Sequence, residues 1–199
     1  MDVRGKVVSK AGVTVFVSDT NGDRWDEVDF GGGGKRASAL SIVTADTIIV
    51  GTEDGQLFRI VRGAGGWAHA TVVPLASPRP GYVSDIVVPG APTGVLWASC
   101  SAFGAGHVFR STDGGQAWSD RTGNLPDIPV NAIVVDPADA ACFFAATDHG
   151  VYRTQNSGGK WTDFSNGLPN VGGGDLILHE RRRLLRAGTR NRGAWEVGI

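Results

Sequence analysis

The sequence has few sulfur-containing residues and no long apolar stretch. Among its 199 residues are two cysteines, Cys100 and Cys142, and one methionine, Met1. Neither cysteine lies in metal-ligand spacing, so we expect no disulfide framework and no metal site, and both cysteines as small buried residues. No run approaches the roughly 18 apolar residues of a membrane span, so we expect no membrane as a partner.

An excess of charge of either sign is also missing. The formal net charge is −1, and the pI is about 6.4. A chain without a basic field is not expected to bind nucleic acid. The one basic run, at 181–183, is more typical of a solvated turn. The first six residues lack the apolar core of a signal peptide, which predicts a cytoplasmic protein, or an extracellular one if a leader has been removed.

Glycine, in contrast, is abundant. The 30 glycines are about twice the average usage. Apolar residues make up 41% and charged residues 20%, which is typical of a globular chain. No segment shows a sustained period of 3.6, so we expect essentially no helix. These features predict a single all-β domain over 1–199, built from short strands and tight turns.

Aromatic residues recur along the whole chain. Four tryptophans are spaced by 42, 51 and 43 residues, and a second aromatic series has spacings of 42, 51, 43 and 43. Each of the four tryptophans follows its partner by nine residues. Such a period is typical of four-stranded β-propeller blades. The two series are Trp25, Trp67, Trp118 and Trp161, and Phe16, Phe58, Phe109, Tyr152 and Trp195.

The repeat divides the chain into five copies, at about 1–30, 37–73, 83–120, 129–165 and 173–199. Within one copy we expect strands A to D, for example at 131–136, 142–147, 150–154 and 160–165. The first copy has little room for strand A, and the fifth ends before strand D. We therefore expect three complete and two partial blades, closed into a five-bladed ring. A fragment of a larger ring, or two chains that complete one ring as a homodimer, are the alternatives.

One turn carries a family resemblance. The stretch 111–118 contains the full pattern Ser-x-Asp-x-Gly-x-x-Trp, and 154–161 and 18–25 are weaker copies. This resembles the Asp-box or BNR repeat of sialidases, xyloglucanases, sortilin-type receptors and photosystem assembly factors, and 95–196 looks especially like bacterial BNR-repeat proteins. The resemblance implies a β-propeller and a structural role for the box residues. These are Ser111, Asp113, Gly115, Trp118, Gly158, Trp161, Ser18, Gly22 and Trp25.

Propeller topology would gather certain loops and the starts of the A strands on one face. Phe103, in the longest of these loops, and Trp97 stand outside the repeated aromatic series. Both are expected to pack within the blade, and the alternative is an exposed aromatic for a sugar or an interface. The predicted ligand-binding face comprises Arg36, Arg79, Tyr82, Phe103, His107, Arg121, Asn131, His149, Arg190 and Arg192.

The main prediction is a non-enzymatic binding propeller that takes a protein or glycan ligand and needs no cofactor. The first alternative is a glycoside hydrolase with Asp85 and Asp175 as its paired carboxylates, since both begin an A strand. The simpler interpretation is that both accept hydrogen bonds in turns. The second alternative is a structural unit that completes a larger assembly. Carboxylates about 5 to 9.5 Å apart on an open pocket would favour hydrolysis. The mass of the native protein in solution tests whether the chain is a structural unit of a larger assembly.

Overall fold

The computed structural model describes residues 6–9, 13–31, 33–90, 94–104, 106–165, 167 and 172–199. Within these ranges the chain forms β-strands and one short 3-10 helix, η1 (Glu180–Arg182), and no α-helix. The strands build five antiparallel sheets. The expected all-β class is therefore confirmed, and no helix in the described ranges is long and apolar enough to cross a membrane.

Each sheet is a meander in which consecutive strands pair, and the sheets are numbered here in chain order. Sheet 1 contains β1 (Lys6–Ser9), β2 (Thr14–Ser18) and β3 (Asp26–Asp29). Sheet 2 contains β4 (Ala37–Thr44), β5 (Thr47–Thr52), β6 (Leu57–Gly63) and β7 (Gly66–Leu75). Sheet 3 contains β8 (Val83–Val87), β9 (Leu96–Cys100), β10 (Val108–Ser111) and β11 (Ser119–Asp120).

The last two sheets follow the same plan. Sheet 4 contains β12 (Val130–Asp136), β13 (Asp139–Thr147), β14 (Gly150–Thr154) and β15 (Trp161–Asp163). Sheet 5 contains β16 (Gly173–His179), β17 (Leu184–Thr189) and β18 (Ala194–Gly198). The strands of sheet 4 lie where the sequence predicted them, to within three residues. Among the described residues the first and last sheets have three strands and the others four.

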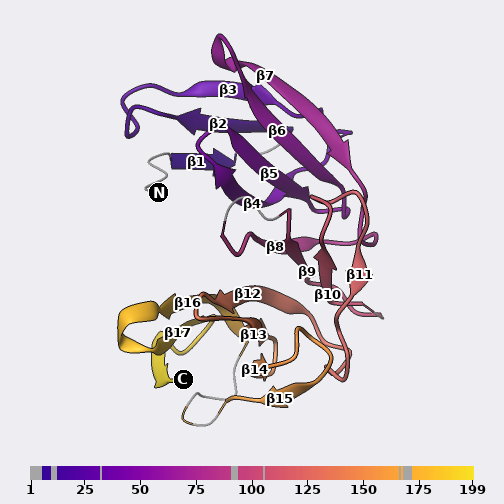
Figure 1. Cartoon of the computed structure of the whole chain (residues 1–199), viewed down its shortest axis with the longest axis vertical. Coiled ribbons are helices and arrows are strands. Elements are labelled where there is room, and N and C mark those ends of the chain that lie inside the picture. The colour runs from indigo at the N-terminus through magenta and orange to yellow at the C-terminus, as the bar shows by residue number, and fades with distance from the viewer. Residues whose placement is uncertain are drawn as a thin grey trace.

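The sheets follow one another in an arc, and neighbouring sheets are packed side by side (Figure 1). The first strands of sheets 2 to 5 contact each other in order, from β4 to β8, β12 and β16. The repeated aromatics hold equivalent register positions, since Phe58 pairs with Val50 as Tyr152 pairs with Ala145. This arrangement explains why the repeat is visible in the sequence. The propeller ring itself stays a prediction.

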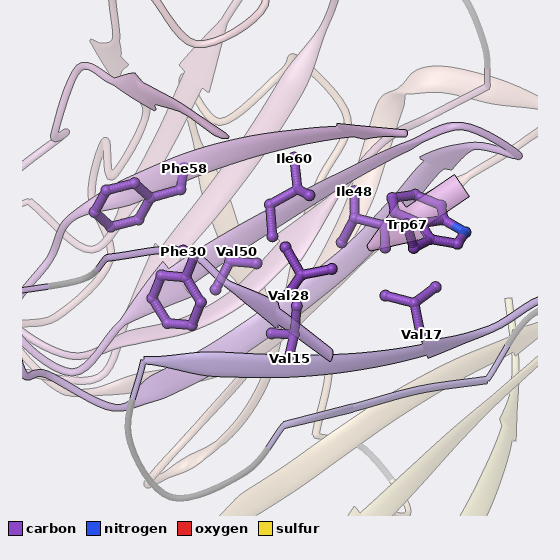
Figure 2. Close-up of a cluster of buried hydrophobic side chains, with 9 residues drawn as sticks. All are labelled: Val15, Val17, Val28, Phe30, Ile48, Val50, Phe58, Ile60 and Trp67. Atoms are coloured by element: carbon purple, nitrogen blue, oxygen red, sulfur yellow. The ribbon is translucent and has the colours of Figure 1, made fainter. Parts of the chain in front are cut away.

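Apolar side chains fill the space between each sheet and the next. Between sheets 1 and 2, Val15 and Val28 face Ile48, Ile60 and Trp67 (Figure 2). Three further clusters join sheets 2 and 3, sheets 3 and 4, and sheets 4 and 5. Because a β-sheet with two apolar faces must cover both, the sheets stabilise one another in series.

The repeated tryptophans contribute to these contacts unequally. Trp67 and Trp161 are 3% and 2% exposed. The indole N–H of Trp161 donates to the Arg121 carbonyl at 3.1 Å, so it also ties sheet 4 to the segment that follows sheet 3. Trp118 donates in the same way to Ala76, at 2.9 Å. Trp25 is 36% exposed, because sheet 1 has no preceding sheet among the described residues to cover it.

The three box turns share one hydrogen-bond plan. A buried hydroxyl accepts a bond from the backbone N–H four residues later, at 2.8 Å for Ser18, 2.7 Å for Ser111 and 3.0 Å for Thr154. In the complete copy Asp113 also accepts from the N–H groups of Gln116 and Ala117, both at 3.0 Å. These bonds lower the pKa of Asp113, with the Ser111 hydroxyl as the main cause. The box side chains therefore close turns in the described structure.

The outer face of sheet 5 differs from the corresponding faces of the other sheets. Arg186 occupies the register position that Ile49, Trp97 and Phe144 hold in sheets 2, 3 and 4, where all three are buried. Arg186 pairs with Glu196 at 2.7 Å, and both side chains are nearly half exposed. This face therefore carries an exposed ion pair where the others carry a buried apolar side chain, although Ile177, which pairs with Arg186, is also exposed on it.

An ion pair between a buried aspartate and a partly exposed arginine fastens sheet 5 to sheet 4. Asp136, at the end of β12, is 2% exposed and accepts two hydrogen bonds from the Arg183 guanidinium, at 2.7 and 2.5 Å. This bidentate contact holds the pKa of Asp136 below its ordinary value. Arg183 presents its side chain from a left-handed backbone position, with φ of 50°.

We expect Gly158→Ala to destabilise the protein more than Gly34→Ala does. Both glycines have φ close to +82°, which costs an alanine about 1 kcal/mol. A Cβ at Gly158 would also lie 2.5 Å from the Arg121 carbonyl oxygen, whereas one at Gly34 meets nothing within 4 Å. The clash should add about 1 to 3 kcal/mol. Urea unfolding measures both variants, and equal losses would contradict the close turn-to-sheet contact.

Candidate functional site

The first strands of sheets 2 to 5, called here the inner strands, each have a β-bulge near their start, and these bulges create the candidate site. In β4, β8, β12 and β16 the pairing register skips one residue, which leaves Ser38, Ser84, Asn131 and Gly174 unpaired. A bulge turns the extra residue away from the regular alternation of side chains. Three of these four positions, in sheets 3, 4 and 5, line one pocket.

The pocket has a volume of about 430 Å³ and is lined mainly by polar groups. It combines bulge residues with side chains from the neighbouring loops. Its lining residues are Tyr82, Ser84, Ser101, Asn131, Gly174 and Arg190. Tyr82, Asn131 and Arg190 belong to the face predicted from the sequence, so the structure brings these three together.

Asn131 lies at the centre of the hydrogen bonds around the pocket. Its amide donates to Asp148 at 2.8 Å and to the Gly173 carbonyl at 3.0 Å. Its carbonyl oxygen accepts from the Ser101 hydroxyl at 2.9 Å and from Arg190 at 3.3 Å. Both ends of the amide are thus fixed in orientation. The Arg190 side chain remains 61% exposed, and its guanidinium is 4.0 Å from Asp148.

The Phe103 loop, defined here as residues 101–104 and 106, borders this pocket through Ser101. Phe103 itself is 69% exposed, while Trp97 is 1% exposed and packs in the core between sheets 3 and 4. The expectation that both aromatics pack within the sheet is therefore right for Trp97 and wrong for Phe103. Arg79, predicted on the same face, donates to three carbonyls of the Phe103 loop.

His107 lies beneath the surface. Its side chain is 1% exposed, with Nε2 3.1 Å from an Asp127 carboxylate oxygen. Burial lowers the pKa of His107, and the nearby Arg79 charge lowers it further, although Asp127 opposes both effects. The imidazole therefore sits behind the Phe103 loop, where a ligand in the pocket would not meet it.

The other predicted face residues are not among those that line the pocket. The Arg121 carbonyl accepts the indole N–H of Trp161, close to the turn at 154–161. The Arg36 carbonyl accepts from the backbone of Glu53. His149 and Arg192 are exposed and are bound through their backbone N–H groups to Thr147 and Thr189.

Asp85 and Asp175 occupy the same register position, two residues into β8 and β16 and just after the bulge. Asp85 accepts from the backbone N–H of Ile86 at 2.8 Å and from that of Ile133, in the next sheet, at 2.9 Å. Burial raises the pKa of Asp85 to about 6, the two N–H groups lower it, and the charge of Asp175 raises it. Asp175 is exposed and accepts from Leu176 at 2.8 Å.

This geometry gives Asp85 a clear structural role as a link between sheets 3 and 4. The sequence offered no sign of the Ile133 contact, because the two residues are 48 positions apart. Ser84, Ser101 and Gly174 were also missed, since small polar residues and glycine carry no functional pattern alone. Among the described residues no group of three or more His, Cys, Asp or Glu side chains could hold a metal ion.

Comparisons with known proteins identify the fold only. No model of a known protein family matches the sequence, and no curated protein matches it. Solved structures do resemble it. The computationally designed Ika8 protein superposes with a TM-score of 0.69 at 12% identity, over 100% of this chain and 57% of that one. Raptor from Chaetomium thermophilum superposes with a TM-score of 0.71 at 12% identity, over 97% of this chain and 18% of that one.

The extracellular domain of BT4673 from B. thetaiotaomicron gives a TM-score of 0.68 at 14% identity, over 97% of this chain and 26% of that one. The chain thus spans little more than half of the designed protein and about a quarter or less of the other two. At these identities the likeness shows a shared fold and assigns no activity.

We expect the ionisation of Asp85 to make the folded protein less stable as the pH rises from 4 to 7. In the folded protein the pKa of Asp85, about 6, lies above its ordinary value of 3.8. The stabilising contribution is therefore complete below pH 3.8 and is lost as the pH passes 6, at most about 3 kcal/mol in all. Urea unfolding of the unmodified chain and of Asp85→Asn should show a stability difference that changes over this range. A constant difference would contradict the raised pKa.

Proposed function

We propose that this chain is a non-enzymatic binding protein that takes a protein or glycan ligand in the pocket around Asn131. The pocket is the observation that carries the proposal. Its volume of about 430 Å³ lies in the usual range for ligand sites. Its lining combines the Arg190 guanidinium and the hydroxyls of Tyr82, Ser84 and Ser101 around the Asn131 amide, whose own hydrogen bonds are made within the protein. Tyr82 is 45% exposed at its rim and provides an aromatic surface for contact.

The fold proposed for this function is a β-propeller of Asp-box repeats, in which the five sheets are blades and the first and last are partial. The repeat spacing, the shared hydrogen bonds of the three turns and the order of the inner strands support it. On the outer face of sheet 5 a neighbouring blade would meet the Arg186–Glu196 ion pair together with the exposed Ile177 side chain. The family assignment rests on the Ser111–Trp118 pattern and on the turn it forms.

Native mass spectrometry tests how such a ring would be completed. A monomer supports a propeller formed by one chain. A homodimer supports the alternative in which two chains complete one ring, and with it a structural role for the protein as part of a larger assembly.

Binding to a panel of polysaccharides, scored by retention, tests the ligand side of the proposal. We expect Arg190→Gln to weaken retention of a bound polysaccharide about tenfold or more, because it removes a charged donor at the pocket. Arg192→Gln, an exposed arginine two residues away, should bind as the unmodified chain does. Equal binding by the unmodified chain, Arg190→Gln and Arg192→Gln would rule out the pocket as the binding site. Without any retention the search turns to a protein partner, beginning with a second copy of the chain.

A glycoside hydrolase is the second candidate function, and one observation favours it. A carboxyl group that stays protonated to about pH 6 is suited to act as a general acid. Asp85 has this property, and the charge of a second carboxylate, Asp175, contributes to it. Release of reducing ends from the same panel measures this activity. We expect no release. Reducing ends that appear with the unmodified chain and vanish with both Asp85→Asn and Asp175→Asn would replace the binding proposal.

A further inference from the structure

The Phe103 loop is held by one guanidinium group. Arg79 donates from Nη1 to the carbonyls of Gly104 and Gly106, at 3.0 and 2.8 Å, and from Nη2 to that of Phe103, at 3.2 Å. Arg79 comes from the segment between β7 and β8, so these contacts reach across more than 20 residues of sequence. Three carbonyl contacts from one planar group define the loop backbone closely. The exposed Phe103 ring is thus presented in a preformed position.

Asp127 holds the same loop from the opposite direction. Its carboxylate accepts from the backbone N–H of Gly104 at 2.8 Å, and the same oxygen is 3.1 Å from Nε2 of His107. His107 directly follows the loop, and its own backbone N–H donates to the Thr122 hydroxyl at 2.7 Å. The imidazole therefore supports the carboxylate that fixes Gly104.

The surroundings of His107 favour the neutral imidazole. The side chain is 1% exposed, and its Nδ1 has no hydrogen-bond partner among the described residues. A proton at Nδ1 would add a buried charge close to the Arg79 guanidinium. Asp127 and the backbone of Ala102 favour the charged form, but burial and Arg79 outweigh them, so the pKa of His107 lies below its ordinary value.

Two further ionisable groups adjoin this cluster. The Cys100 backbone N–H donates to the His107 carbonyl, and burial raises the pKa of the Cys100 thiol to about 11, so it remains neutral. A Cβ built on Gly106 would lie 3.4 Å from the Asp120 carboxylate, which places this acidic group beside the loop. Asp120 accepts from the Thr122 N–H at 2.8 Å. Neither group supplies a partner for Nδ1.

We propose that Arg79, Asp127 and His107 form a latch that keeps the Phe103 loop closed at neutral pH and releases it in acid. The latch concerns the loop alone, and its use in controlling a ligand rests on the proposed binding function. In the closed loop a protonated His107 is buried beside Arg79. In the open loop the His107 side chain is exposed to water, and its pKa takes the ordinary value near 6.5. The open state therefore gains population as the pH falls below about 6.5, by up to tenfold per pH unit.

Amide hydrogen exchange of Gly104, measured by NMR on the full chain without ligand, tests the latch. Protection is corrected for the intrinsic pH dependence of exchange. We expect it to fall by up to tenfold per pH unit between pH 6.5 and the lower pKa of His107. His107→Gln should stay protected over the whole range, since Gln cannot gain a charge. His149→Gln, the matched control in the corresponding loop of sheet 4, should behave as the unmodified chain does.

Two outcomes would overturn the latch. One is Gly104 protection that does not change with pH in the unmodified chain. The other is an equal loss of protection in His107→Gln, which would assign the loss to another titrating group. Asp85→Asn then shows whether Asp85, with its pKa of about 6, is that group. If His107→Gln does not fold, the titration of the unmodified chain decides, because the Gly104 amide shift must follow the same midpoint as the His107 imidazole. Arg79→Gln should lower protection at every pH, and full protection in that variant would also refute the latch.

Discussion

Polar bonds between the inner strands of neighbouring sheets are the constraint on which the candidate site depends. Ser84 donates to the Val130 carbonyl at 2.6 Å, and Asn131 donates to that of Gly173 at 3.0 Å. Each bond runs from a bulge residue of one sheet to the first residue of the next sheet's inner strand. The hydrophobic effect between the sheets is non-directional, whereas these directional bonds set the register of one sheet on another. The pocket exists because three sheets meet in that register.

The same arrangement separates structural side chains from those available to a ligand. Asp85 has both carboxylate oxygens committed to backbone N–H groups, and Arg79 has its donors committed to loop carbonyls. Arg190 and Tyr82 remain largely exposed beside them. A binding surface with a rigid base and a few exposed groups loses little conformational entropy when it meets a ligand. Such a surface suits the proposed binding function.

Burial and hydrogen-bond partners shift the pKa values of several ionisable groups away from their ordinary values. Burial raises the pKa of Asp85 and lowers that of His107, so each favours the neutral form for the same reason. Asp136 behaves in the opposite way, because a bidentate arginine compensates its charge on burial. The difference follows from the partners, since a guanidinium neutralises a carboxylate and backbone N–H groups do so only in part.

The sequence by itself determined the all-β class, the positions of the strands and the residues that close the turns. These features depend on local chemistry, such as the hydroxyl of Ser111 and the N–H of Gly115 only four residues away. It also pointed to Tyr82, Asn131 and Arg190. Only the tertiary structure decided that Asp85 binds Ile133, that His107 is buried and that Phe103 is exposed. Those outcomes depend on bulges, and on contacts between segments far apart in the chain, and neither leaves a periodic trace in the sequence.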